Sequence, residues 1–264
     1  MSHITDYARQ LEQLLQRQQE LIPPDESGSA IQVELGAVFA KTLLDPNFQF
    51  STPSVGNSSR IIDGNGHTRP IYRPLLSYAL MQAMIQSHHK PAIPRPVLEP
   101  FDWPQEILPA NLAEPAALAC WNALILHVAG VDGAWKIFDR LVVRQQKNGS
   151  FLLAGPSDSP DMRWYHELLL LHALAGYAAQ SGEPSADAAV RRNAIFHLEE
   201  SQPDHATNQP WALFAFIRVA EARPLADQML HTLQTQYPNG IGGIAAILVA
   251  DALLCLQSVA DLLP

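Results

Sequence analysis

Residues 134–146 read AWKIFDRLVVRQQ, and residues 164–179, farther along the chain, read WYHELLLLHALAGYAA. In the first stretch the apolar residues recur at steps of three and four, which is the spacing of one buried helical face. The second stretch is apolar almost all round, which predicts a helix covered on most of its sides. An amphipathic helix followed by an apolar helix is therefore the predicted unit of the fold.

The same alternation occurs along the rest of the chain. An amphipathic helix is predicted from Ile4 to Ile22, and an apolar helix from about Ala30 to Leu44. Further pairs, amphipathic then apolar, are predicted at 75–86 with 113–129, 186–202 with 211–220, and 225–236 with 241–256. The apolar helices must form an inner layer and the amphipathic helices an outer one, because each apolar surface has to be buried. We expect an all-α chain of about five helical hairpins, stacked as an open solenoid or as a closed ring of two layers.

The 264 residues are predicted to form one domain, residues 1–264, because this length is near the upper end of what a single core holds. Two stretches do not fit the helical pattern and are predicted to be long loops, residues 45–73 and the proline-rich residues 90–112. No segment alternates between polar and apolar residues, so no sheet is expected. Loops of this length either cover a site or strap the surface.

The composition excludes several partners. The net charge is −9 and no cluster of Lys and Arg occurs, which argues against nucleic acid and against anionic membrane surfaces. Residues 241–256 are the most apolar stretch, but Asp251 interrupts them, so we predict a core helix and no membrane span. The two cysteines, Cys120 and Cys255, each lie in an apolar helical run and read as small buried hydrophobes, and the start of the chain lacks the pattern of a secretory signal. A cytoplasmic location is predicted.

The end of the helix at 134–146 carries the most specific motif. Gln145, Gly149 and Phe151 have the spacing Gln-x-x-x-Gly-x-aromatic, and weaker copies follow at Gln202 and at residues 236–242. The motif resembles the QW repeat of the squalene and terpenoid cyclases, whose α/α-toroid fold is shared with the protein prenyltransferases. In such a turn we expect the Gln to bond free backbone groups, the Gly to adopt positive φ and the aromatic ring to pack over the Gln. The resemblance implies a complete or incomplete α/α toroid.

The chain departs from the catalytic motifs of that superfamily. The acidic motif Asp-x-Asp-Asp of the cyclases would fall at residues 158–161, where the doublet is missing. The Asp that precedes the zinc-binding Cys of the prenyltransferases is replaced by Leu118 before Cys120 and by Leu253 before Cys255. None of the family's catalytic residues can be carried over, and the sequence leaves open whether the chain is an enzyme.

The start of the apolar helix near residue 161 is the richest candidate site. An acid, two cationic or titratable groups and two aromatic rings occur within two turns, at a helix N-terminus whose free N–H groups favour anions. The start of the next apolar helix, at residues 204–211, has a similar make-up. The candidate catalytic residues are Asp161, His166, Glu167 and His205. The candidate ligand contacts are Trp121, Arg163, Trp164, Tyr165, Asp204 and Trp211.

Each of these residues also has a structural interpretation. Asp161 and Asp204 are typical N-caps, and the lone histidines His127 and His172 inside apolar helices are typical hydrogen-bonded core residues. We predict no metal or other cofactor, because no ligand pair has the spacing of helical metal ligands. Only a spatial approach of Asp204 and His205 to the 166–167 pair would create a metal site.

Three functions remain open from the sequence. The first is an aromatic-lined cavity that binds or transforms an apolar, isoprenoid-like small molecule. The second is a non-catalytic module whose surface binds a protein partner or a second copy of the chain. The third is a carbohydrate-active hydrolase or lyase in which Asp161 and Glu167 flank a cleft. The fold alone does not choose among them.

Overall fold

The computed structural model describes residues 2–20, 40, 43–44, 60–62, 68–70, 73–86, 113–131, 133, 135–151, 160–200, 209–236 and 243–260. In these residues the chain is predominantly α-helical, as predicted. The helices are α1 (Ser2–Glu20), α3 (Arg73–Gln86), α5 (Ala113–Val128), α6 (Lys136–Arg144), α7 (Pro160–Ser181), α8 (Pro184–Glu199), α9 (Leu213–Arg218), α10 (Arg223–Gln236) and α11 (Gly243–Ala260), with a short 3-10 turn η1 (Ala220–Ala222).

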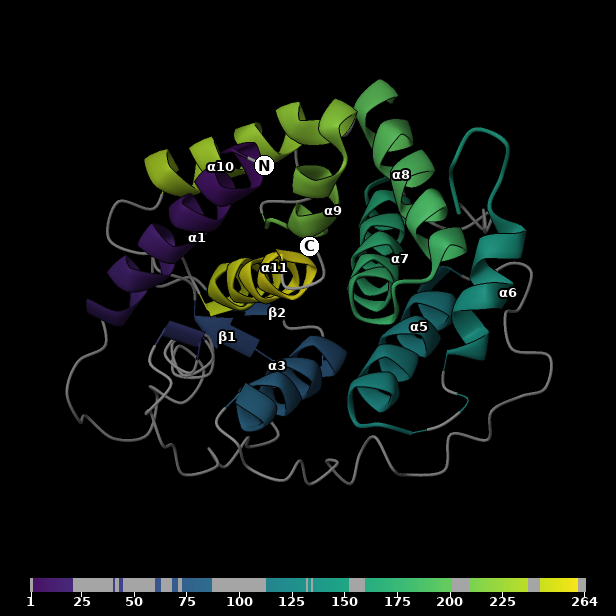
Figure 1. Cartoon of the computed structure of the whole chain (residues 1–264), viewed down its shortest axis with the longest axis horizontal. Helices are drawn as coiled ribbons and strands as arrows, with labels where there is room; N and C mark the ends of the chain where they lie inside the picture. The colour runs from purple at the N-terminus through teal and green to yellow at the C-terminus, as the bar shows by residue number, and fades with distance from the viewer. Residues whose placement is uncertain are drawn as a thin grey trace.

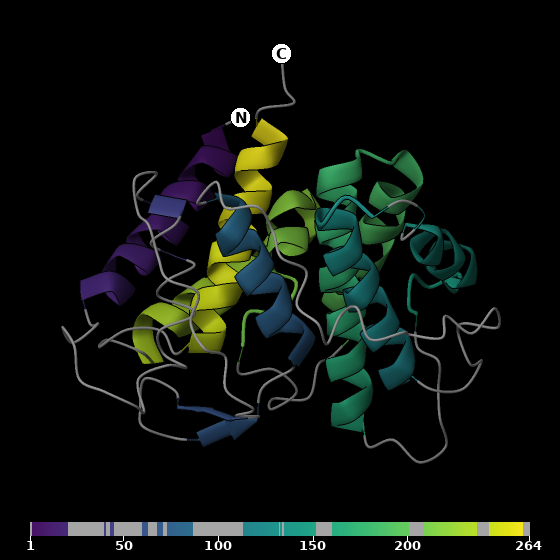
Figure 2. The same ribbon diagram turned by 90° about the horizontal axis from the view of Figure 1, so that it is seen from below.

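The helices are arranged in an inner and an outer layer (Figure 1). Helices α1, α10, α8 and α6 form an outer arc around α11, α9, α7 and α5. Helix α3 packs on α5 and lies between α5 and α11 in both views (Figures 1 and 2). Outer and inner helices alternate along the chain from α5 to α11, because each amphipathic helix covers the apolar helix that follows or precedes it.

The two helices predicted to be most apolar lie in the interior. In α7 every residue from 166 to 179 is buried, and in α11 the residues from 245 to 253 are buried. Helix α6 instead buries only one face, formed by Ile137, Phe138 and Leu141, and leaves Val143 84% exposed. The predicted division into inner and outer helices is confirmed for these elements, because burial follows the apolar pattern of each helix.

The N-terminal helix lies against the C-terminal one. Helix α1 packs along α11 through an apolar face that includes Leu11 and Leu15, both fully buried. The Tyr7 hydroxyl donates to Asp227 Oδ1 on α10 at 2.6 Å. Most of the helix predicted from Ala30 to Leu44 and all of the stretch 90–112 lie outside the described residues.

The stretch 45–73, predicted as loop, contains a short β-ribbon. Strand β1 (Arg60–Ile62) pairs antiparallel with β2 (Thr68–Pro70), with Ile61 opposite Arg69. The two strands have three residues each, too few to show a period-two pattern, and this ribbon leaves the all-α class of the chain as predicted.

Helix α9 begins later and ends earlier than the predicted helix at 211–220. Ala212, directly before α9, has a left-handed backbone with φ 56°, which an L-residue adopts only at a cost. Its N–H donates to a histidine side chain, His172 Nδ1, at 3.1 Å, and not to a helical carbonyl. After Arg218 the chain changes to η1, and α10 then begins at Arg223 with Pro224 in its first turn. A tertiary contact therefore sets the start of α9.

Candidate functional site

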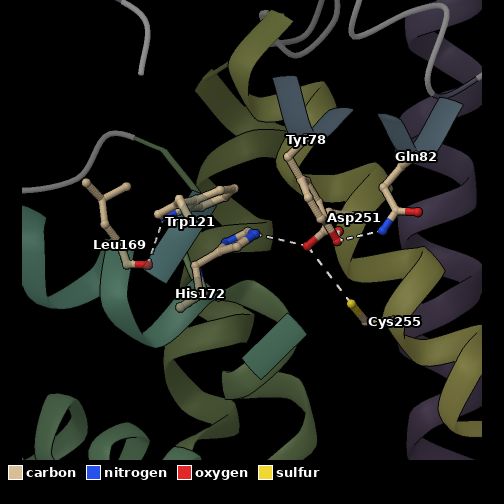
Figure 3. Close-up of polar contacts among 8 residues, drawn as sticks. Tyr78, Gln82, Trp121, Leu169, His172, Asp251 and Cys255 are labelled. Atoms are coloured by element: carbon tan, nitrogen blue, oxygen red, sulfur yellow. Dashed lines mark hydrogen bonds and ion pairs between the residues drawn. The ribbon is translucent and has the colours of Figure 1, made fainter. Parts of the chain in front are cut away.

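Aromatic and polar side chains from several helices lie close together in the interior of the molecule (Figure 3). Helices α3, α5, α7 and α11 each contribute one member, and another comes from the second residue before α9. All of them are almost completely buried. This central cluster consists of Tyr78, Trp121, His172, Trp211 and Asp251.

Asp251 accepts hydrogen bonds with both carboxylate oxygens (Figure 3). The Tyr78 hydroxyl donates to Oδ1 at 2.7 Å, and His172 Nε2 lies 2.9 Å from Oδ2. Gln82 Nε2 donates to the Tyr78 oxygen at 2.9 Å, and Cys255 Sγ lies 4.0 Å from Oδ2. Burial and the charge of Asp251 raise the pKa of Tyr78 well above its ordinary value, so Tyr78 stays a hydroxyl donor.

His172 is fixed in one tautomer. The N–H of Ala212 donates to Nδ1, so Nδ1 carries no proton and the Nε2–H group donates to Asp251. A neutral imidazole with one donating and one accepting nitrogen has both of its hydrogen-bonding positions occupied. The His172–Asp251 pair therefore ties α7 and the start of α9 to α11, and neither ring nitrogen is free to accept a substrate proton.

A row of aromatic rings leads from the central cluster toward the start of α7. Trp121 stacks on His172, with ring centroids 5.0 Å apart, and its indole N–H donates to the Leu169 carbonyl at 3.1 Å. Trp211 meets Trp121 edge to face at 6.2 Å, and Tyr165 meets Trp211 edge to face at 5.8 Å. Tyr165 is only partly buried. The row therefore begins at a partly exposed ring and ends in the centre of the molecule.

A second polar group lies between α7 and α8. Glu167 Oε1 accepts the N–H of Phe151, and Asn193 Nδ2 donates to the same oxygen at 2.7 Å and to the Gly149 carbonyl at 2.9 Å. Burial raises the pKa of Glu167 to about 7, although both hydrogen bonds act in the opposite direction. We call Glu167, Asn193 and the turn 149–151 the interlayer cluster.

Trp164 takes part in a separate aromatic contact with α8. It stacks on Phe196, with centroids 5.5 Å apart and planes 16° apart, and faces His197 at 5.2 Å. Burial lowers the pKa of His197 to about 3, so this imidazole is neutral at physiological pH. Trp164 and Tyr165 thus project to different faces of α7, the first toward the outer layer and the second toward the start of α9.

The turn after α6 has the geometry that the motif Gln-x-x-x-Gly predicts. Gln145 Nε2 donates to the carbonyls of Gly149 and Ala189, each at 2.9 Å, and Arg192 Nε donates to Gln145 Oε1 at 2.8 Å. Gly149 has φ 91°, as expected for a glycine in this turn. Phe151 is 2% exposed. The glutamine therefore joins the end of α6 to α8, and its predicted role is confirmed.

Replacing Gln145 by Ala is expected to lower the free energy of unfolding by roughly 1–2 kcal/mol, because the Gly149 carbonyl loses one of its donors and Arg192 loses its acceptor. Urea unfolding followed by circular dichroism measures this change. Gln180→Ala, at an exposed position of α7, is the matched control and should change stability by less than about 0.5 kcal/mol. Equal effects of the two substitutions would contradict the role of Gln145.

The structure brings some of the predicted site residues together. Trp121, Tyr165 and Trp211 form one aromatic row, whereas Trp164 lies on another face of α7. His166 and Glu167 are both buried.

For the remaining predicted site residues, the structure describes only the backbone or nothing at all. Helix α7 begins at Pro160, so Asp161 lies inside its first turn and not at the N-cap as predicted, because the proline occupies the first helical position. The side chains of Asp161 and Arg163, like all of Asp204 and His205, lie outside the described residues, and with them the predicted approach to His166 and Glu167.

Tyr78, Gln82 and Asp251 were not among the residues predicted for a site. His172 was predicted to be a hydrogen-bonded core residue, which is confirmed. A signal for the central cluster was present. Asp251 and His172 are isolated ionisable residues inside apolar helices, and such residues are buried only when they are paired. The sequence therefore indicated that each needed a partner, although not that they were partners of each other.

Both cysteines are buried and free, as predicted, and burial raises the pKa of Cys120 to about 12. Within the described ranges, no three His, Cys, Asp or Glu side chains are grouped so that they could hold a metal ion. None of the helices in the described part of the chain combines the length and apolar character that crossing a bilayer requires. Comparisons with protein-family models, with curated proteins and with solved structures give no match.

Proposed function

We propose that the chain is an α/α-toroid protein, related in fold to the terpenoid cyclases, that binds an apolar, isoprenoid-like small molecule where α7 and α9 begin. The aromatic row carries this proposal. Tyr165 is the partly exposed end of the row, and Trp211 and Trp121 continue it inward. Aromatic faces of this kind suit a ligand with little polar surface. The toroid is supported by the two helical layers and by the Gln145–Gly149 turn.

The hydrogen bonding of the central cluster fits a protein that binds a ligand without transforming it better than it fits an enzyme. An acid or base that acts on a ligand must have a proton, or a lone pair, that can reach the ligand. His172 uses both ring nitrogens within the protein, and the Tyr78 hydroxyl donates to Asp251 and accepts from Gln82. Glu167, one of the predicted catalytic residues, faces α8 and the turn at Phe151. We therefore propose a binding protein rather than a cyclase.

A specific observation also favours the alternative of a non-catalytic interaction module. The residues of the central cluster are buried between the helices, and a packed core suits a rigid scaffold that presents its outer surface to a protein partner. On this alternative the aromatic row is only part of the core.

Tyr165→Ala is expected to weaken the binding of an isoprenoid alcohol roughly tenfold, because it removes the accessible ring of the row. The measurement is a titration of the purified protein with farnesol and with geranylgeraniol, followed by tryptophan fluorescence. Native mass spectrometry of the protein as purified would in parallel detect any small molecule that remains bound.

Trp135→Ala is the matched control, since Trp135 is an aromatic residue that is 40% exposed directly before α6. It should leave the affinity unchanged. An unchanged affinity in Tyr165→Ala would contradict the proposed site, and failure of the wild-type protein to bind either alcohol would favour the interaction module.

A further inference from the structure

Two buried acceptor atoms in the interlayer cluster have no hydrogen-bond donor among the described residues. They are Glu167 Oε2 and Asn193 Oδ1. The two residues are 1% and 0% exposed, so water does not reach these atoms freely. A buried acceptor without a donor has lost its hydrogen bonds to water and gained none in return, so a native structure usually supplies a donor.

The orientation of the Asn193 amide follows from its neighbours. The carbonyl of Gly149 can only accept, so the amide atom facing it must be the donor Nδ2. The same Nδ2 donates to Glu167 Oε1. Both amide protons are therefore used, and a flipped amide would place oxygen against oxygen at both contacts. Asn193 Oδ1 remains as an acceptor on a group already bonded to the Glu167 carboxyl.

We propose that Glu167 is a neutral carboxylic acid in the folded protein at pH 6, and that its Oε2–H group donates to Asn193 Oδ1. A single proton on Oε2 then gives both of the unpartnered atoms a hydrogen bond. The acid and the amide form a closed pair in which Asn193 Nδ2 donates to Oε1 and Oε2 donates to Oδ1. Oε1 keeps the N–H of Phe151 as its second donor.

The charged and titratable groups around Glu167 are consistent with a neutral acid. On α8, His197 is neutral because burial lowers its pKa to about 3, and Arg192 directs its guanidinium to Gln145 at the surface. On the turn Lys147 is exposed, and on α7 the neighbouring His166 is buried. Burial raises the pKa of Glu167 from 4.5 to about 7, and none of the described cationic side chains lowers it.

The Glu167–Asn193 pair stabilises the turn between α6 and α7. Asn193 holds the Gly149 carbonyl and Glu167 holds the N–H of Phe151, so one proton stabilises contacts at both ends of the turn. A carboxyl whose pKa is higher in the folded state than in the unfolded state binds its proton more tightly when folded. Stability is therefore greatest below about pH 4.5, falls as the pH rises to about 7, and is constant above that pH as far as this group is concerned.

Infrared spectroscopy of the whole chain tests the proton directly. At pH 6 we expect a band from a protonated carboxyl group that disappears as the pH is raised to 9 and is missing from Glu167→Gln at both pH values. Absence of the band in the wild-type protein at pH 6 would overturn the proposal without any variant. Persistence of the band in Glu167→Gln would assign it to another group and would also overturn the proposal.

Thermal unfolding provides the second measurement. Glutamine resembles the neutral acid, and its amide N–H can replace the Oε2–H donor. Glu167→Gln should therefore unfold at the wild-type temperature at pH 5 and roughly 5–10 °C above it at pH 8. Glu199→Gln, at the exposed end of α8, should follow the wild-type protein at both values. If the unfolding temperatures of Glu167→Gln and of the wild-type protein changed with pH in parallel, the Glu167 proton would not stabilise the turn.

Discussion

Asp251→Ala is expected to lower the free energy of unfolding by roughly 3–5 kcal/mol, because it leaves two buried donors without an acceptor. The Tyr78 hydroxyl and the His172 Nε2–H group both donate to this carboxylate, and all three side chains are less than 5% exposed. Neither donor can turn to water without opening the contact between α3, α7 and α11. Urea unfolding at pH 7, followed by circular dichroism and by tryptophan fluorescence, measures the loss.

Asp227→Ala is the matched control for this substitution. Asp227 also accepts a hydrogen bond from a tyrosine, Tyr7, but it is exposed and the bond is only partly buried. Its replacement should cost no more than about 1 kcal/mol. Similar losses in the two variants would mean that the central cluster contributes no more than a surface contact, contrary to the burial of its donors.

Gly149→Ala is expected to lower the free energy of unfolding by roughly 3 kcal/mol, as the sum of two costs. The first is the left-handed backbone at φ 91°, which disfavours any residue with a Cβ atom. The second is a clash, because a Cβ atom at this position would lie 2.4 Å from the Arg192 carbonyl oxygen on α8. The backbone of α8 would have to move, and the contacts of Gln145 and Asn193 with Gly149 would move with it.

Gly182→Ala separates the two costs. Gly182, at the end of α7, also has a positive φ of 66°, but a Cβ atom there would meet nothing within 4 Å. It should lose only about 1 kcal/mol, from the backbone conformation alone. The same urea experiment compares both variants. A loss in Gly149→Ala no greater than that in Gly182→Ala would show that the turn and α8 are not in close contact.

The alternation of amphipathic and apolar stretches predicted the helices at α6, α7 and α11 and the layer to which each belongs. It succeeded because burial of a helical face depends on local spacing, as Ile137, Phe138 and Leu141 show in α6. The same reasoning missed the start of α9, because the backbone of Ala212 is held by a histidine forty residues earlier in the chain.

One part of the candidate site could be predicted from the sequence and another part could not. The Gln145–Gly149 turn was predictable, since its glutamine bonds the carbonyl four residues later and its glycine needs a positive φ. The central cluster was not, because the hydrogen bond between His172 and Asp251 spans 79 residues and the one between Tyr78 and Asp251 spans 173. From the sequence, His172 and Asp251 each indicated only that a buried polar residue needs a hydrogen-bonding partner.

The helical class of the chain, the inner or outer layer of several helices and the conformation of the turn at Gly149 could be predicted from local sequence patterns. These depend on periodicity and on backbone sterics, which act over a few residues. Which isolated polar residues are paired, which tautomer His172 adopts and which groups bond Glu167 depend instead on how distant helices pack. Pairing of buried polar groups depends on the packing of distant helices, and no local pattern along the chain specifies it.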